Sequence, residues 1–210
     1  MITCFSRDSY TSLINDVAGK DFRLAKVIDQ FGYPPFFGRS KGFACLVRII
    51  LEQQVSLTSA FHTFKRLETG LEELTADRIC SLNPDQIKAF GITRQKTVYI
   101  KHLADKITNG HLDLDELDTL PDAQVKAKLT SLKGIGPWTA DIYLTMGLKR
   151  MDVFPSGDLA IRKAMAGLGF SDQDAEAAEK AALAFAPYRS IFSFLLWHWY
   201  ICTNTIKLPG

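Results

Sequence analysis

Two glycines set one residue apart, Gly134 and Gly136, stand between two stretches whose apolar residues have helical spacing. Glycine adopts backbone conformations that residues with a Cβ avoid, so this pair predicts a tight turn between two helices. Gly136 suits the capping position of the second helix, and Pro137 suits its first turn. The turn therefore presents backbone amides at the start of a helix with no bulky side chain in the way. Such a place binds anions, phosphate above all.

A single carboxylate follows a short way downstream, where Asp158 ends the segment Phe-Pro-Ser-Gly-Asp at residues 154–158. An aspartate at the start of a helix is most often a cap for the backbone amides, and that interpretation is open here. The same amides stabilise a charged carboxylate. A charged carboxylate in turn stabilises a developing sugar cation or positions a water molecule, as hydrolysis of a glycosidic bond requires.

Helical spacing of apolar residues recurs along the chain, and no segment shows convincing strand alternation. Around the two glycines we predict one helix over residues 121–132 and a second over 137–146, ended by Gly147. Other helices are separated by turns that contain glycine and proline, such as residues 32–35. The sequence therefore predicts an all-α protein of about ten helices.

The composition is that of a folded globular protein, with 210 residues, 47% hydrophobic and 23% charged, and a formal net charge of +2. This mild charge argues against a purely electrostatic nucleic-acid binder, so any surface for nucleic acid must be local. No segment resembles a secretory signal or is long enough to span a bilayer. We expect a cytoplasmic protein, nucleoid-associated if bacterial, with no membrane partner. The four cysteines form no Cys-x-x-Cys pair, so neither zinc nor an iron–sulfur cluster is indicated.

Residues 134–140 (Gly-Ile-Gly-Pro-Trp-Thr-Ala), together with 154–158, resemble the motifs of the helix-hairpin-helix (HhH-GPD) superfamily of DNA glycosylases. The similarity is greatest to its 3-methyladenine DNA glycosylase II branch and extends from about residue 42 to about residue 200. Three further segments agree in order and spacing: the loop at 51–56, the helix start at 90–96 and the C-terminal helix near 187–190. The resemblance implies an all-helical enzyme that flips a damaged base out of duplex DNA and cuts its bond to the sugar.

The same resemblance implies that residues 1–210 form a single HhH-GPD unit with two lobes. A central lobe would cover about residues 42–150 and contain the helix-hairpin-helix at 121–146. The N-terminal and C-terminal helices would form the second lobe. Too few residues precede Phe43 for the extra N-terminal β-domain that some relatives carry, so we expect none.

The family's base-binding and catalytic roles are carried over to the matching positions of this chain. Asp158 matches the catalytic aspartate, and Trp138 and Trp197 match aromatic residues that line the base pocket. Ile142 and Leu159 stand at pocket positions where some relatives carry aromatic side chains. Without the motif, core packing would be the ordinary interpretation of both tryptophans.

The roles in DNA binding follow in the same way. Gln54 matches the wedge that fills the gap left by the flipped nucleotide, although a polar turn residue is the simpler interpretation. The hairpin would grip phosphate through backbone amides around Gly134 and Gly136, beside Lys133 and Thr139. In the family a monovalent cation often sits on hairpin carbonyls. In this chain, those Na⁺ or K⁺ ligands would be the carbonyls of Thr130, Leu132 and Ile135.

Trp138 decides between two mechanisms. Members of the superfamily that also cut the strand have a lysine here, whose amine attacks the sugar, and tryptophan cannot do this. The resemblance therefore implies a monofunctional enzyme that needs no cofactor, acts as a monomer on double-stranded DNA and leaves an abasic site. An indole face attracts a positively charged base, which favours purines alkylated at N3 or N7, such as 3-methyladenine and 7-methylguanine. Two alternatives stay open: a glycosylase for hypoxanthine, uracil or a mismatch, and a non-catalytic helix-hairpin-helix DNA-binding protein.

Overall fold

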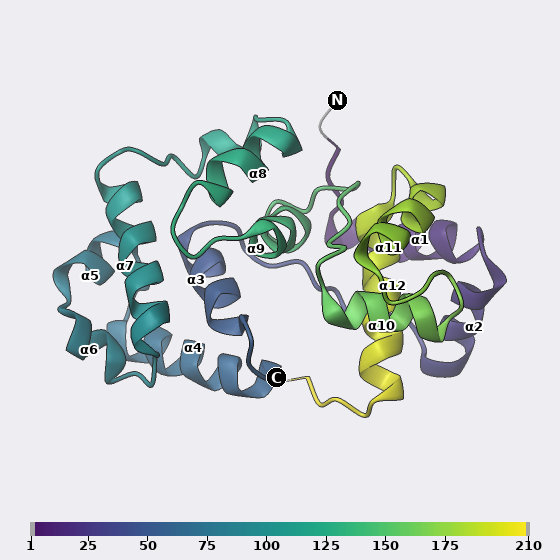
Figure 1. Cartoon of the computed structure of the whole chain (residues 1–210), viewed down its shortest axis with the longest axis horizontal. Coiled ribbons are helices and arrows are strands. Elements are labelled where there is room, and N and C mark those ends of the chain that lie inside the picture. The colour runs from purple at the N-terminus through teal and green to yellow at the C-terminus, as the bar shows by residue number, and fades with distance from the viewer. Residues whose placement is uncertain (1–2, 209–210) are drawn as a thin grey trace. The chain divides into compact units, whose positions relative to one another are not determined.

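The computed structural model describes residues 3–208, which form twelve α-helices and no extended strand (Figure 1). An isolated β-bridge between Cys4 and Arg150 is the nearest approach to a sheet within this range. The predicted all-α class is therefore confirmed. None of the helices in the described range is long and apolar enough to cross a membrane.

The chain divides into two compact units, with boundaries at residues 39/40 and 143/144. The sequence had predicted a central lobe over about residues 42–150. Unit 2 covers residues 40–143, and unit 1 is formed by residues 3–39 with 144–207. Unit 1 therefore combines helices from the two ends of the chain.

Unit 2 is built around α3, in which seven of ten residues are buried. Such a helix, apolar on nearly all sides, requires neighbours on several faces, and α3 packs against α4, α7 and α9. Helices α5 and α6 pack in turn on α7. The elements of this unit are α3 (Phe43–Glu52), α4 (Leu57–Leu71), α5 (Ala76–Ser81), α6 (Pro84–Lys88), α7 (Arg94–Thr108), the 3₁₀ segment η1 (Glu116–Asp118), α8 (Asp122–Thr130) and α9 (Pro137–Ile142).

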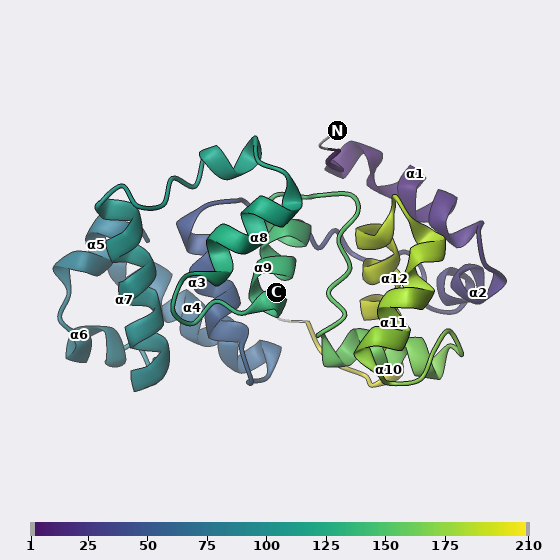
Figure 2. The ribbon, with the colours of Figure 1, turned by 45° about the horizontal axis from the view of Figure 1, so that its top comes forward.

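Unit 1 is built around α12, where nine consecutive residues from Ser190 to His198 are buried. Helices α1, α2 and α10 pack against α12, and α11 packs against α10 (Figure 2). An aromatic cluster fills the centre, with Phe185 stacked on Phe192 at 3.8 Å between ring centroids. The elements are α1 (Arg7–Ala18), α2 (Phe22–Phe31), α10 (Leu159–Gly167), α11 (Ala175–Ala182), the 3₁₀ segment η3 (Leu183–Phe185) and α12 (Arg189–Thr203).

The helix-hairpin-helix is present with small changes of boundary. Its first helix, α8, ends at Thr130 rather than near residue 132. The second, α9, begins at Pro137 with Gly136 as its N-terminal cap, as predicted. After Ile142 the chain continues as a π-helical segment, Tyr143–Gly147, so the expected helix over 137–146 changes its hydrogen bonding midway.

Candidate functional site

Asp158 caps the N-terminus of α10, and two donors reach the same oxygen of its carboxylate, Oδ1. The backbone N–H of Ile161 donates to Oδ1 at 3.0 Å. The indole Nε1–H of Trp197, on α12, donates to Oδ1 at 3.2 Å. The structure therefore confirms Asp158 as a cap, and its carboxylate is also held by a side chain 39 residues away. Its catalytic role stays a prediction.

The segment that precedes Asp158 is held to the start of α12 by an ion pair and hydrogen bonds. Arg189 donates from Nε to Asp152 Oδ1 at 2.8 Å and from Nη2 to Asp152 Oδ2 at 3.0 Å. The next residue of each segment makes a second contact. The Ser190 hydroxyl donates to the Val153 carbonyl and accepts from the Val153 N–H, both at 3.1 Å. A bidentate ion pair and a paired side-chain contact leave this segment little freedom. Residues 187–190, which the resemblance singled out, thus help to place Asp158.

Trp197 lies in an aromatic group within unit 1. Its side chain is largely buried, with 7% of the residue exposed, and Phe37 and Phe194 lie at ring-centroid distances of 6.1 Å and 5.8 Å. Leu159, next to Asp158, is 54% exposed. The structure therefore brings Asp158, Leu159 and Trp197 together in one unit. Their assignment to a base pocket stays a prediction.

The hairpin in unit 2 uses its two glycines for different reasons. Gly134 has φ +89°, and a Cβ built there would stand 2.1 Å from the Tyr99 ring on α7. Gly136 has φ −93°, and apart from Gly136 itself and its chain neighbours no atom of the described residues lies within 4 Å of where its Cβ would stand. Gly134 is therefore required by the fold, while Gly136 leaves open space in front of the α9 amides. Within residues 3–208, no side chain caps α9 by a hydrogen bond.

An ion pair and buried side chains hold the two hairpin helices together. Lys126 on α8 lies 2.8 Å from the largely buried carboxylate of Asp141 on α9. Leu129, Leu132 and Ile135 are buried beneath the turn. Lys133 is exposed at the tip of the hairpin, so its charge is available to an anion there.

The loop after α3 is tied to the hairpin by Gln53, a residue that the sequence analysis did not assign. Gln53 Nε2 donates to the Gly134 carbonyl and to the Thr139 hydroxyl, both at 2.9 Å. The neighbouring Gln54 is exposed and has φ +56°, an uncommon conformation for a residue with a side chain. Gln54, the predicted wedge, therefore directly follows a residue that is hydrogen-bonded to the hairpin.

Lys96 anchors the same loop from the first turn of α7. Its ammonium donates to the carbonyls of Leu51 at 2.7 Å and Gln53 at 2.8 Å, at the end of α3. Burial lowers the pKa of Lys96 below its ordinary value, and the negative charge of Glu52 partly opposes this. The sequence indicated only that the segment 90–96 is similar to the family. It did not predict the role of Lys96, because no local pattern indicates which carbonyls a lysine will reach.

Thr130, whose carbonyl is a predicted cation ligand, is the last residue of α8, and three further predicted residues lie on α9 in unit 2. Trp138 is partly buried in its first turn, and Ile142 at its end is 2% exposed. Thr139 is also buried, and its hydroxyl is engaged by Gln53. A contact of Thr139 with DNA would therefore use its backbone amide rather than its side chain.

Comparisons with a family model and with known proteins show which proteins the chain resembles. Residues 47–187 match the family model described as HhH-GPD superfamily base excision DNA repair protein. A DNA-3-methyladenine glycosylase of Saccharomyces cerevisiae is 31% identical over 57% of this chain and 51% of its own length. The putative DNA-3-methyladenine glycosylase YfjP of Bacillus subtilis is 26% identical over 83% of this chain and 64% of its own length. The chain thus spans between half and two thirds of the length of these relatives.

Solved structures show the same fold. A DNA-3-methyladenine glycosidase of Bacillus halodurans is 26% identical and covers 98% of this chain and 96% of its own, with a TM-score of 0.76. A Schizosaccharomyces pombe 3-methyladenine DNA glycosylase in complex with abasic DNA has a TM-score of 0.78 at 22% identity, covering 95% of this chain and 99% of its own. With the family model matching well over half of its residues, the chain belongs to the HhH-GPD superfamily of base excision DNA repair proteins.

Proposed function

We propose that this protein is a monofunctional DNA glycosylase that hydrolyses the N-glycosidic bond of alkylated purines and leaves an abasic site. It acts as a monomer on double-stranded DNA, and 3-methyladenine and 7-methylguanine are its expected substrates. Relatives named as 3-methyladenine DNA glycosylases support this choice over hypoxanthine, uracil or a mismatch. The carboxylate of Asp158, held at one oxygen by a backbone amide and an indole, is the observation that carries the proposal.

The carboxylate supplies what the reaction needs on the sugar side. Cleavage of the bond to the base leaves positive charge on the sugar, and a fixed negative group stabilises that charge or orients the attacking water. The two donors to Oδ1 hold the carboxylate in one orientation, so it need not reorganise as charge develops. An alkylated purine already carries positive charge and leaves readily, so modest assistance is enough.

Trp138 supports both the substrate class and the absence of strand cleavage. Its indole cannot form a Schiff base with the sugar, whereas the lysine of strand-cleaving relatives can. Stacking and cation–π attraction between an indole and a cationic base contribute about 0.5–2 kcal/mol. After base removal, the strand should therefore break only on heating or with alkali, and borohydride should trap no covalent complex.

The hairpin supplies a grip on the DNA backbone that does not depend on sequence. Gly136 leaves the α9 amides approachable, and Lys133 adds positive charge beside them. A Na⁺ or K⁺ ion would be held by the carbonyls of Thr130, Leu132 and Ile135. The Leu132 carbonyl accepts a hydrogen bond from the Ile135 N–H at 3.1 Å and keeps a second lone pair for such an ion.

The deciding experiment compares two aspartate caps. Asp158→Asn should abolish release of alkylated bases from methylated duplex DNA, measured by chromatography of the free bases, while DNA binding is largely retained. Asp174→Asn is the matched control, because Asp174 caps α11 through the Ala177 N–H at 2.9 Å and the proposal gives it no role in the reaction. Asparagine is as good a cap as aspartate, so both variants should fold. Full activity in Asp158→Asn would refute the catalytic assignment.

Wild-type DNA binding without release of any base from a panel of lesions would favour the non-catalytic alternative. Preferential release of uracil or hypoxanthine would instead correct the substrate class.

A further inference from the structure

The end of α3 is held by a side chain from α7. The ammonium of Lys96, in the first turn of α7, donates to the backbone carbonyls of Leu51 at 2.7 Å and of Gln53 at 2.8 Å. Carbonyls at the end of a helix lack partners within that helix, and a cation there also meets the negative end of the helix dipole. Lys96 therefore fixes the backbone at the point where the chain leaves α3.

Gln53 is held from two sides. Its carbonyl accepts from Lys96, and its side-chain Nε2 donates to the Gly134 carbonyl and to the Thr139 hydroxyl, each at 2.9 Å. The residue is therefore tied to α7 through its backbone and to the hairpin through its side chain. We call these four hydrogen bonds, two donated by Lys96 and two by Gln53, the Lys96–Gln53 clamp.

The hairpin also contacts α7 directly. The ring of Tyr99, three residues after Lys96, occupies the place where a Cβ of Gly134 would stand. Residues three apart on a helix lie on the same side of it, so one side of α7 faces both the end of α3 and the hairpin turn. Each of these three elements of unit 2 contacts the other two, and a shift of any one of them would break contacts with both.

Gln54 follows the clamp directly and is exposed, with φ +56°. A residue with a side chain holds this uncommon backbone conformation only where its surroundings impose it. Gln53 is fixed on one side, and on the other side the Ser56 hydroxyl caps α4 by accepting from the Ser59 N–H at 3.2 Å. Between these fixed points lie Gln54 and Val55 alone. The loop therefore presents the Gln54 side chain from a backbone with little freedom.

We propose that Lys96 and Gln53 are positioning residues for Gln54, and that their clamp sets the distance between the hairpin's grip on phosphate and the side chain that enters the duplex. The proposal rests on the proposed function, in that the hairpin binds DNA and Gln54 fills the gap left by a flipped nucleotide. A wedge on a free loop would lose backbone freedom on entering the duplex, and that loss would weaken its insertion. With the clamp, the loop is already ordered when the protein folds.

The test is the ratio of two affinities at pH 7, one for a duplex with a tetrahydrofuran abasic analogue and one for the same duplex intact. The intact duplex reports the grip of the hairpin, whereas the abasic duplex also has a gap for the wedge to fill. Lys96→Met removes the two donated bonds, and the ratio should fall by about fivefold to thirtyfold, the cost of ordering the backbone of one residue. The loss of charge alone weakens both affinities and cancels in the ratio. An unchanged ratio would overturn the proposal.

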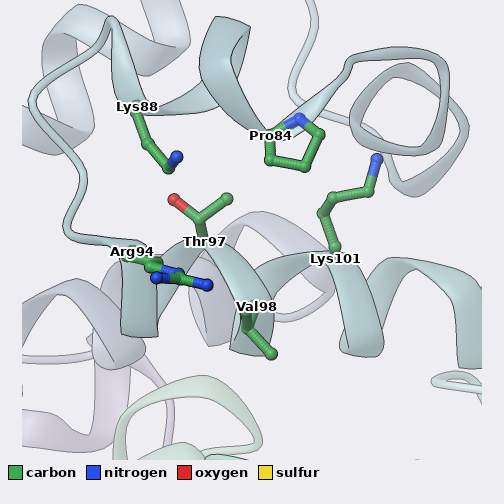
Figure 3. Close-up of a pocket in the computed structure, with 6 residues that line it drawn as sticks. All are labelled: Pro84, Lys88, Arg94, Thr97, Val98 and Lys101. Carbon is green, nitrogen blue, oxygen red and sulfur yellow. The ribbon is translucent and has the colours of Figure 1, made fainter.

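Lys101 provides the matched control on the same helix. It donates to the carbonyl of Leu82, the C-cap of α5, and it is partly buried like Lys96. Figure 3 shows Lys101 with Pro84 in the lining of a cavity of about 450 Å³, which includes neither residue of the clamp. Lys101→Met therefore removes the same charge and the same kind of bond to a helix end, and the ratio should not change. An equal fall in both variants would assign the effect to a general loosening of α7 and refute a role in positioning.

A double-mutant cycle decides whether Lys96 acts through Gln54. In Gln54→Ala the wedge side chain is gone, so adding Lys96→Met should lower the ratio by less than about twofold. A merely structural role for Lys96 would lower the ratio alike in both backgrounds, and that result would contradict the proposal. A wild-type ratio in Gln54→Ala would do the same, because Gln54 would then not be the wedge.

Gln53→Met tests the other half of the clamp, and it replaces Lys96→Met if circular dichroism shows that variant to be unfolded. It leaves both bonds of Lys96 in place and removes the two donated to the hairpin. Its ratio should fall when residue 54 is glutamine and stay constant when residue 54 is alanine. A fall of the same size in both backgrounds would show that Gln53 only supports the fold.

The ratio requires no base release, so the clamp and the reaction are tested separately. If the wild type releases no alkylated base, the proposed reaction fails, and the cycle still decides the role of the clamp. If base release is normal and the effects of the two substitutions simply add, the proposed reaction stands and the positioning role is refuted.

Discussion

The starts of α9 and α10 solve the same local problem in opposite ways. Each helix begins with amides that need a partner. At α10 the chain supplies one internally, the carboxylate of Asp158. At α9 the cap is Gly136, whose backbone offers no side chain, and the space in front of it is open. At α10 the partner of the amides is therefore a carboxylate of the protein itself. At α9 the amides are open to an anionic group of a ligand.

Both helix starts are nevertheless held by a side chain from a distant helix or loop. Gln53 donates to Gly134 and Thr139 beside α9, and Trp197 donates to Asp158 at α10. At α9 the support fixes the backbone that would meet DNA. At α10 it holds the carboxylate to which we assign the catalytic role. Substitutions at the first site should therefore change stability and affinity, and those at the second should change rate.

The largest expected effect is at Gly134. Gly134→Ala combines a left-handed backbone position with a Cβ 2.1 Å from the Tyr99 ring. It should lower the free energy of unfolding by about 2–4 kcal/mol, measured by urea denaturation. Gly136→Ala has neither problem, so its stability should change by less than about 0.5 kcal/mol. Its DNA affinity should fall instead, because a methyl group would occupy the space that Gly136 leaves open at the start of α9. Equal losses of stability in the two variants would contradict this distinction.

The next effect concerns the donor to Asp158. Trp197→Phe keeps an aromatic ring but removes the Nε1–H bonded to the carboxylate. A hydrogen bond to a charged group contributes about 1.5–3 kcal/mol, so single-turnover base release should fall by roughly tenfold to a hundredfold. Trp199→Phe is the control, because Trp199 lies on the same helix and packs against Gly167 instead. A similar loss in both variants would assign the effect to packing of α12.

Gln53 and Gln54 provide a sharper contrast within one loop. Gln53→Ala removes two hydrogen bonds to the hairpin and should lower the free energy of unfolding by about 1–2 kcal/mol. Gln54→Ala keeps the same kind of backbone strain at an exposed residue, so stability should hold while base flipping weakens. Fluorescence of a base analogue at the lesion site reports flipping. Destabilisation by Gln54→Ala and none by Gln53→Ala would reverse the two roles.

The sequence was sufficient for features whose cause is local. Gly136 as a cap and Pro137 in the first turn follow from backbone preferences of those residues alone, and the structure confirms both. The capping role of Asp158 is of the same kind, and the structure confirms it. The supports were not predictable, because Gln53 and Gly134 are 81 residues apart, and Trp197 and Asp158 are 39 apart. Such contacts are set by how α3, α7 and α12 pack, and a single sequence carries no local signal of that.

The smallest predicted effect is a pH dependence of stability at Lys96, which is hydrogen-bonded to the loop that carries Gln54. Burial places the pKa of Lys96 below that of a lysine in the unfolded chain, so between the two values the unfolded state binds more protons. The contribution of Lys96 to the free energy of unfolding should therefore rise as the pH increases from the folded pKa to the unfolded pKa. Below the folded pKa the buried amine is charged, and there its contribution is least favourable. The neutral amine keeps N–H donors for the carbonyls of Leu51 and Gln53.

The measurement is the difference in free energy of unfolding between the wild type and Lys96→Met from pH 7 upward. That difference should grow in favour of the wild type as pH rises, with Lys180→Met on α11 giving the baseline for alkaline titration elsewhere. A difference that shrinks with pH would mean that the charged ammonium, not the amine, is what the two carbonyls stabilise. The loop that ties Gln53 to the hairpin would then rely on a fixed internal charge, as the start of α10 does.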